Sequence, residues 1–269
     1  MARTTSLIPE QRRQRILRAL RAEQVLSYRQ IAEMLDVSPM TARRDVAALA
    51  EQGRLTATQG GASALTRMIS EPRRSEKAAA NIAEKSAIAR AAAARVSDSM
   101  TVYLDAGTTV QAMRPHLEEV EGLTIVSNDL GTIRSFLDHP SADLICLGGR
   151  LDRDNESMIG RLAALTLAEL SLDIAFLSSS SWDVRHGATT PVEAKVDPKR
   201  AAHASATATV LLAGSDKFGT YAKYRVLALD EFDAIITDDG LADADASAIE
   251  VAALERVAAT PRRADAPGA

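Results

Sequence analysis

The sequence is poor in the residues on which disulfide-stabilised and metal-binding proteins depend. Of its 269 residues only one is a cysteine, Cys146, so no disulfide can form within the chain, and this favours a reducing cytoplasm. Cys146 lies in an apolar run, which predicts a buried structural thiol rather than a nucleophile. The four histidines are scattered singly and show no metal-ligand spacing. We therefore expect neither a metal nor a cofactor.

Long hydrophobic runs and aromatic residues are scarce as well. No stretch approaches the roughly 18 uninterrupted apolar residues of a membrane span, and the N-terminus lacks the apolar centre of a signal peptide, so we expect no membrane partner. Aromatic residues make up 3% of the chain and hydrophobic residues 46%, so Ala, Leu, Val and Ile must build the core. The length allows a small N-terminal module and one larger domain.

Charge divides the chain into a basic N-terminal part and an acidic remainder. Residues 1–60 contain ten Lys and Arg and six Asp and Glu, a net charge of +4. Residues 61–269 contain 22 Lys and Arg and 30 Asp and Glu, a net charge of −8. This asymmetry predicts a nucleic-acid surface at the N-terminus. Because the basic excess is modest, useful affinity requires two copies on one site, and we expect a homo-oligomer, a dimer or a tetramer.

Residues 37–45 have the composition of a helix that begins sharply and then displays positive charge. Ser38 can cap the free N–H groups of the first turn, and Pro39 suits the first helical position, where a missing N–H costs nothing. A basic helix and a short helix over residues 28–35 precede this segment across a turn. This succession of helix, turn and helix predicts a helix-turn-helix unit.

The third helix of this unit should have an apolar face and an exposed basic face. At 100° per residue, Ala42, Val46 and Leu49 fall together and should pack on the first two helices. The opposite side offers guanidinium groups, which suit guanine edges or phosphates, and a methyl-bearing chain that can touch thymine. The candidate DNA-binding residues are Ser38, Met40, Thr41, Arg43 and Arg44. The alternative is a merely solvated face, but the cap, the turn and the charge balance favour DNA.

A short strand-like stretch follows the third helix. Gly53 ends that helix, residues 54–58 have strand character and Gly60-Gly61 closes them, which predicts the wing of a winged helix-turn-helix. We therefore expect a DNA-binding domain over residues 8–62 and a linker over residues 63–75.

The rest of the chain alternates short apolar runs with helix-like segments, which is typical of a Rossmann-like α/β domain with a largely parallel sheet. The runs cover residues 101–104, 123–127, 144–147, 174–177, 209–213 and 234–237. This domain should span residues 76–257, with helices over 76–96 and 242–257. Residues 258–269 are expected to be a disordered tail.

Polar residues follow the predicted strands, at the sheet edge where ligands bind in such folds. Gly107 permits close approach of a ligand, and Thr108 and Thr109 stand at a helix N-terminus, which suits a phosphate. Asp105 could accept a hydrogen bond from a sugar hydroxyl. The candidate effector-binding residues are Asp105, Gly107, Thr108, Thr109, Asn128, Gly148, Gly149, Lys199 and Lys217. The alternative reading of residues 105–109 is an ordinary strand-to-helix turn with a good cap.

Two sets of motif residues connect the chain to a known family. The first set is Val37, Ser38, Thr41, Arg43, Arg44, Asp45, Gly60 and Gly61. The second set is Asp105, Gly107, Thr108, Thr109, Asn128, Gly148, Gly149, Lys199, Arg200, Ala201, Lys217, Phe218 and Gly219. In both sets, over about residues 8–240, the chain resembles the DeoR family of bacterial transcriptional regulators. The resemblance implies a second domain similar in fold to ribose-5-phosphate isomerase that senses phosphorylated sugars or related metabolites.

The chain departs from the family pattern around the expected pocket. Gly214 stands where the family usually has an Asp, and Ser178–Ser181 with Trp182 replaces a glycine-containing segment. We expect a modified pocket, in which packing of Trp182 is favoured over stacking on a ligand ring.

The resemblance implies a repressor of a sugar or polyol catabolic operon. Its partners would be double-stranded operator DNA and a small phosphorylated sugar or polyol effector. The alternative is a sugar-phosphate isomerase-like enzyme with a DNA-binding appendage, for which Asp105 and Glu193 are the available bases. Because Gly214 replaces the expected carboxylate, we expect no catalytic residue. A third reading is a DNA-binding scaffold that responds to no ligand.

Overall fold

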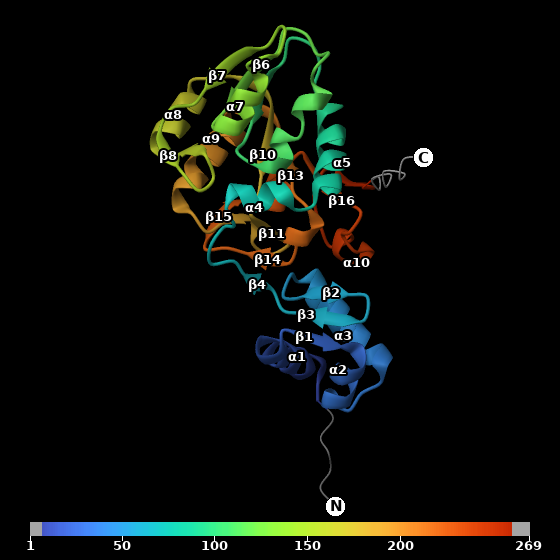
Figure 1. Cartoon of the computed structure of the whole chain (residues 1–269). Coiled ribbons are helices and arrows are strands. Elements are labelled where there is room, and N and C mark those ends of the chain that lie inside the picture. The colour runs from blue at the N-terminus through green and yellow to red at the C-terminus, as the bar shows by residue number, and fades with distance from the viewer. Residues whose placement is uncertain (1–6, 260–269) are drawn as a thin grey trace, which may run out of the picture.

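The computed structural model describes residues 7–259, which form a small N-terminal head and a larger body joined by a narrow connection (Figure 1). We call residues 7–63 the head, residues 64–73 the strap and residues 74–259 the body.

The head contains three helices and a three-stranded antiparallel sheet in the order β1-β3-β2. Its elements are α1 (Pro9–Glu23), β1 (Val25–Ser27), α2 (Tyr28–Leu35), α3 (Pro39–Glu51), β2 (Thr56–Thr58) and β3 (Gly61–Ser63). Ala42, Val46 and Leu49 of α3 are fully buried in the core of the head, as their spacing predicts. Strands β2 and β3 form the predicted wing, so the head is a winged helix-turn-helix.

The body is built on a seven-stranded parallel sheet in the order β17-β16-β13-β10-β5-β6-β7. The strands are β5 (Thr101–Leu104), β6 (Thr124–Ser127), β7 (Asp143–Cys146), β10 (Leu172–Ser178), β13 (Ala206–Leu212), β16 (Ala234–Asp238) and β17 (Leu254–Val257). All six apolar runs of the sequence are strands of this sheet. The α/β prediction is therefore confirmed.

A hydrophobic core covers each face of the sheet because neighbouring residues of a strand point to opposite sides. Tyr103 of β5 belongs to one core, and Val102 and Leu104 belong to the other. The first core contains residues of α8 (Arg161–Ala168) and α9 (Val196–Ser205), and the second contains residues of α5 (Ile82–Ala93), α6 (Thr108–Gln111) and α7 (Leu130–Phe136). The body is thus a helix–sheet–helix sandwich.

The chain order reverses between β5 and β10. From β5 the strands run outward through β6 to β7, whereas from β10 they run the other way to β17. The carboxyl ends of strands at such a switch point are the usual place for a ligand site in open α/β sheets.

Shorter elements surround this central sheet. They are α4 (Arg74–Ala79), η1 (Arg114–His116), β8 (Arg150–Asp152), β9 (Ser157–Ile159), β11 (Ser181–Asp183), β12 (Gly187–Thr190), η2 (Glu193–Lys195), η3 (Ser215–Lys217), β15 (Tyr224–Leu227), η4 (Leu229–Glu231) and α10 (Asp243–Ala246). Within residues 7–259, no helix has the length and apolar character needed to cross a membrane.

Three local predictions need correction. The helix expected over residues 242–257 is wrong, because only α10 is helical there and β17 extends the sheet by pairing with β16. The helix expected over residues 76–96 is interrupted at Asn81, which has a left-handed φ of 51°. Cys146 is exposed rather than buried, because β7 is an edge strand. Of the expected tail, residues 260–269 lie outside the described residues.

The strap carries a direct connection between the head and the body. Its strand β4 (Thr66–Arg67) pairs in parallel with β14 (Thr220–Tyr221) of the body, and the N–H of Met68 donates to the carbonyl of Tyr221 at 2.7 Å. Beside this pair, the head approaches Gly219 so closely that a Cβ there would lie 2.2 Å from Oγ1 of Thr56. The predicted linker is therefore a structured segment in close contact with both parts.

Candidate functional site

Helix α3 begins with the cap that its sequence predicts. Ser38 is the N-cap residue, and its Oγ accepts the backbone N–H of Thr41 at 3.2 Å. The same Oγ lies 2.9 Å from Oγ1 of Thr41, so both hydroxyls are engaged at the start of the helix. Pro39 occupies the first helical position, which fixes where α3 begins.

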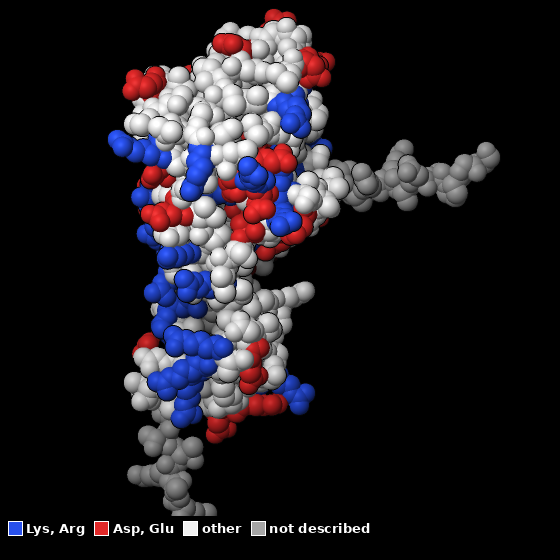
Figure 2. Space-filling model, turned by 60° about the vertical axis from the view of Figure 1, so that its left-hand side comes forward, with Lys and Arg blue, Asp and Glu red and all other residues white. Residues whose placement is uncertain are grey.

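The exposed side of α3 displays an apolar residue and two arginines. Met40 is 67% exposed, and Arg43 and Arg44 are exposed one turn later. The guanidinium carbon of Arg43 lies 5.1 Å from the ring centre of Tyr28, a cation–π contact that orients it across α2. Figure 2 shows basic residues, which within the head are all arginines, gathered along one side of it. The exposed side of α3 can accept a polyanion without rearrangement of the helix.

Asp45 has a structural role that the motif alone does not reveal. Its carboxylate is buried and accepts Nε of Arg12 in α1 at 2.6 Å, with Nε of Arg13 at 3.6 Å. A buried carboxylate requires such partners because burial of an unpaired charge is very unfavourable. Asp45 therefore fixes α3 against α1, whereas the two preceding arginines remain on the surface.

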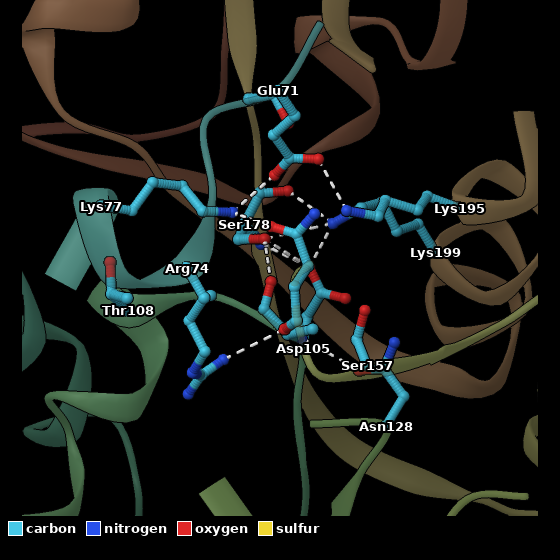
Figure 3. A pocket seen from close by; sticks show the side chains of 14 residues that line it. Glu71, Arg74, Lys77, Asp105, Thr108, Asn128, Ser157, Ser178, Lys195 and Lys199 are labelled. Atoms are coloured by element: carbon cyan, nitrogen blue, oxygen red, sulfur yellow. Dashed lines mark hydrogen bonds and ion pairs between the residues drawn. The ribbon is translucent and has the colours of Figure 1, made fainter. Parts of the chain in front are cut away.

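In the body, two adjoining cavities lie at the carboxyl ends of β5 and β10 and are covered by the strap and α4. An inner cavity of about 20 Å³ and an outer cavity of about 260 Å³ share part of their walls. The shared lining comprises Glu71, Lys77, Ala106, Gly107, Thr108, Ser178 and Ser180. The inner cavity is drawn in Figure 3, where side chains from the strap, α4, the β5 loop, β10 and the segment around α9 converge. We call the two cavities together the pocket.

Asp105 is held at the floor of the inner cavity by donors of the protein itself. Its Oδ2 accepts the backbone N–H of Ser178 at 2.9 Å and the Ser178 hydroxyl at 2.7 Å, and it forms an ion pair with Nζ of Lys199. Both ionic side chains are buried. The structure thus brings the predicted residues Asp105 and Lys199 together, but as partners of each other.

The loop after β5 has the close approach that its glycine predicts. A Cβ at Gly107 would lie 2.8 Å from the Cβ of Ser178, so only glycine fits between the loop and β10. Asn128 fixes the same loop, because its Oδ1 accepts the N–H of Ala106 at 2.9 Å. Thr108 lines both cavities and Thr109 lines the outer one, at the start of α6. The first N–H groups of a helix have no partner within it, so they are available to an oxyanion here.

Four charged residues of the pocket were not among the predicted site residues. Lys77 and Lys195 each donate to a different oxygen of the Glu71 carboxylate, both at 2.6 Å. Arg74 forms a two-oxygen ion pair with the buried Asp129, at 2.5 and 3.0 Å. The signal that could have found Glu71, Arg74 and Lys77 is the density of charge in residues 71–77, which is unusual for a plain connector.

Burial disfavours the charged form of Glu71, but the charges and hydrogen bonds of Lys195 and Lys77 outweigh this effect. The net result lowers the pKa of Glu71 to about 2. Its carboxylate is therefore ionised at any physiological pH, and the inner cavity already contains one bound anion.

Lys217 supplies a different kind of positive charge to the outer cavity. Its Nζ donates to the carbonyl of Ser179 at 3.0 Å, and burial lowers the pKa of Lys217 to about 8, partly opposed by Asp216. Near neutral pH this lysine is largely protonated and lies close to its titration range. An anionic ligand would favour its charged form.

Several predicted residues lie elsewhere or serve the fold. Gly148 and Gly149 are exposed beyond the end of β7 and do not line either cavity. Trp182 is fully buried, with its Nε1 donating to the carbonyl of Gly214 at 3.1 Å, so it packs rather than stacking on a ligand. Glu193, considered as a catalytic base, is exposed and outside the pocket. Within residues 7–259, no group of three or more metal-ligating side chains comes together.

Comparison with protein families matches both parts of the chain. Residues 12–68 match the DeoR-like helix-turn-helix domain, and residues 80–239 match the DeoR C terminal sensor domain.

Individual proteins are similar over most of the chain. An uncharacterized HTH-type transcriptional regulator of Escherichia coli (strain K12), YgbI, is 40% identical over 243 residues, which cover 90% of this chain and 95% of that protein. The transcriptional repressor AccR of Agrobacterium fabrum (strain C58 / ATCC 33970) is 31% identical over 234 residues, or 86% of this chain and 90% of that protein. Among solved structures, ribose 5-phosphate isomerase A from Methanocaldococcus jannaschii aligns with a TM-score of 0.37 and 16% identity, over 50% of this chain and 53% of that one.

The two relatives that are similar over most of the chain, YgbI and AccR, are regulators of transcription. The interpretation of the sequence as an isomerase is therefore not supported. The pocket agrees with this conclusion. Of the two carboxylates considered as bases, Asp105 is paired with Lys199 and Glu193 lies outside the pocket.

Proposed function

Because this chain belongs to the DeoR family of DNA-binding transcriptional regulators, we propose that it represses a sugar or polyol catabolic operon and releases its operator when a phosphorylated sugar or polyol fills the pocket. The observation that supports the DNA-binding half most directly is the capped helix α3 with its exposed arginines. The observation that supports the sensing half is the cation-rich pocket at the switch point of the sheet.

In this proposal α3 lies in the major groove of double-stranded DNA. Arg44 and Met40 point to base edges, and Arg43, oriented by Tyr28, contacts a base or a phosphate. Ser38 and Thr41 lie at the N-terminus of the helix, where a backbone N–H can bind a DNA phosphate. The wing contacts the DNA backbone beside it.

The effector occupies the outer cavity with its phosphate directed inward. The N–H groups of Thr108 and Thr109 and the charge of Lys217 bind the anion, while Gly107 allows its close approach. Asp105, Asn128 and Lys199 shape the floor of the site through their contacts with each other and with the loop. Gly148 and Gly149 have no part in this binding.

The repressor acts in the cytoplasm as a homo-oligomer. Two heads on a repeated or palindromic operator add their contacts, which compensates for the modest basic excess of one head. An effector releases the operator only if it binds the DNA-free arrangement of the repressor more tightly than the DNA-bound arrangement.

A gel-shift experiment at defined salt tests the proposal. The protein should bind the upstream region of its own operon in preference to unrelated DNA, and one of a set of sugar and polyol phosphates should release it. Absence of any sequence preference would reject the regulatory role. Binding that no phosphorylated metabolite changes would leave a ligand-independent scaffold instead.

A further inference from the structure

The carboxylate of Glu71 lies in the pocket in the manner of a bound ligand. It extends from the strap, its side chain is 9% exposed, and each of its oxygens receives one lysine ammonium at 2.6 Å (Figure 3). The two lysines come from distant parts of the chain, Lys77 from α4 and Lys195 from η2. Two ammonium groups on the two oxygens of one anion are also the arrangement that a phosphate or carboxylate of a ligand would receive.

Each lysine also has a contact other than Glu71. Lys195 is held from another side by Asp152, with Nζ 3.3 Å from Oδ2, and Lys77 also donates to the side-chain oxygen of Asn155. Departure of Glu71 would leave two fixed and largely buried positive charges facing the cavity. Lys77 would then have no carboxylate partner and Lys195 only Asp152, so a replacement anion would be favoured, because a poorly paired buried charge is unfavourable.

The volumes show that Glu71 fills the place where an oxyanion would bind. The inner cavity has about 20 Å³ left, which holds roughly one water molecule and no phosphate group. The outer cavity of about 260 Å³ admits a small ligand, and Glu71 forms part of the wall between them. A ligand in the outer cavity can therefore place a phosphate beside Thr108 and the two lysines only if Glu71 leaves.

Glu71 is also attached to the connection between the two parts of the molecule. It follows Met68 by three residues, and Met68 is hydrogen-bonded to β14 next to the short β4–β14 pair. That pair lies beside the contact between Gly219 of the body and Thr56 of the head. Withdrawal of Glu71 from the pocket would thus move the strap at the point where the head is fixed.

We infer that Lys77 and Lys195 form an oxyanion subsite of the effector pocket, which Glu71 occupies in the free protein and which the effector takes over by displacing Glu71. This inference rests on the proposed sensing function and adds to it the residue pair that binds the anion and the route to the head. The ligand group is an oxyanion, either a phosphate or a carboxylate.

Removal of the internal anion tests the subsite directly. In full-length Glu71→Gln, inorganic phosphate should bind on the order of tenfold more tightly than in the wild type, because it no longer competes with the carboxylate. Calorimetric titration with phosphate, repeated with acetate at matched ionic strength, measures the affinities and shows which oxyanion the subsite prefers. Glu119→Gln, which removes an exposed carboxylate, is the charge-matched control and should bind like the wild type.

Thermal unfolding keeps the test valid if the variant is less stable. Glu71→Gln should melt below the wild type in chloride, and phosphate or acetate should restore its melting temperature, whereas these anions should affect Glu119→Gln no more than the wild type. Adding Lys77→Gln and Lys195→Gln should abolish this restoration. Equal anion affinity in the wild type and Glu71→Gln, including binding to neither, would overturn the subsite.

DNA binding separates this inference from the function on which it rests. If the subsite is coupled to the head, phosphate should weaken operator binding by Glu71→Gln more than by the wild type in gel shifts. Sequence-specific DNA binding with no gain in anion affinity would refute the inference and leave the repressor function standing. A gain in anion affinity without sequence-specific DNA binding would support the subsite and refute the repressor function.

Discussion

The head and the body hold their positive charges in opposite ways. On α3, Arg43 and Arg44 are exposed, and the buried Asp45 next to them is paired with arginines of α1 instead. In the inner cavity the cations are bound to carboxylates of the protein. These pairs are Arg74 with Asp129, Lys77 and Lys195 with Glu71, and Lys199 with Asp105.

This difference corresponds to two kinds of recognition. Exposed charges attract any polyanion and gain by releasing its counterions, so the head has affinity for DNA before it reads a base. The inner cavity, whose charges are internally neutralised, instead discriminates between ligands, because a ligand must replace an existing partner with good geometry. The same residue types therefore provide general attraction in one region and selectivity in the other.

The largest expected effect comes from breaking a pair in the pocket. Arg74→Ala leaves the fully buried carboxylate of Asp129 without its ion-pair partner, and we expect a loss of about 3–5 kcal/mol in the free energy of unfolding. Urea denaturation measures it. Arg44→Ala, which removes an exposed arginine of the head, should change stability by less than about 0.5 kcal/mol. Similar losses for both variants would contradict the contrast between the regions.

The corresponding change in the head should affect DNA binding and leave stability intact. Arg44→Ala should weaken binding to the operator by about 1–3 kcal/mol and relax specificity at one base pair if the side chain reads a base. Titrations against the operator and against unrelated DNA give the two affinities. An equal loss on both sequences would identify Arg44 as a phosphate contact.

Lys217 allows the pocket's electrostatics to be tested by pH. Since burial lowers its pKa to about 8, the lysine loses its charge above that pH, and affinity for an anion should fall by about tenfold per pH unit there. Titration with inorganic phosphate between about pH 8 and 9.5, where phosphate itself remains a dianion, checks this dependence. In Lys217→Arg, where the charge persists, the affinity should stay constant, and a parallel decline in both proteins would assign the effect to another group.

The last expected effect concerns the contact between the two regions. Asp245 in α10, which contacts α3 and β2, is buried, and burial raises the pKa of its carboxyl from 3.8 to about 6. The folded protein therefore retains a proton that the unfolded chain releases between these values, so the free energy of unfolding falls as pH rises through this window.

Replacement by a neutral side chain should remove that pH dependence. Asp245→Asn should be more stable than the wild type by at most about 3 kcal/mol at pH 7, because each unit of raised pKa corresponds to about 1.4 kcal/mol, and should nearly match it near pH 4. Melting temperatures across this range provide the measurement. A variant that is less stable at pH 7 would show that the ionised carboxylate has a favourable partner in the folded protein.

The elements that the sequence predicts well are those defined by local pattern. The cap at Ser38, the buried face of α3 and the first six strands of the sheet follow from side-chain spacing, which burial on one or both faces imposes. Residues 254–257 behave differently. Their alanine-rich surroundings favour a helix, yet pairing with β16 makes them an edge strand, and such long-range pairing is not encoded in local propensity.

The pocket shows the same limit. Residues after β5 and β10 were identifiable because they end strands, but the sequence does not tell that β7 lies at the sheet edge, away from the switch point. Gly148 and Gly149, predicted as effector-binding residues, therefore line neither cavity, and Cys146 was wrongly expected to be buried. Glu71 and Lys195 escaped notice because 124 positions separate them in the chain.

The tethered carboxylate of Glu71 has a consequence for the dose response of the regulator. A competitor attached by a short segment of chain acts at an effective concentration on the order of millimolar, and dilution cannot remove it. Background metabolites that carry a single weakly bound oxyanion therefore stay below the response threshold, while a ligand that also fills the outer cavity exceeds it. Substitution of Glu71 alone would therefore change the effector concentration at which the regulator responds, without any change to the surfaces that read DNA.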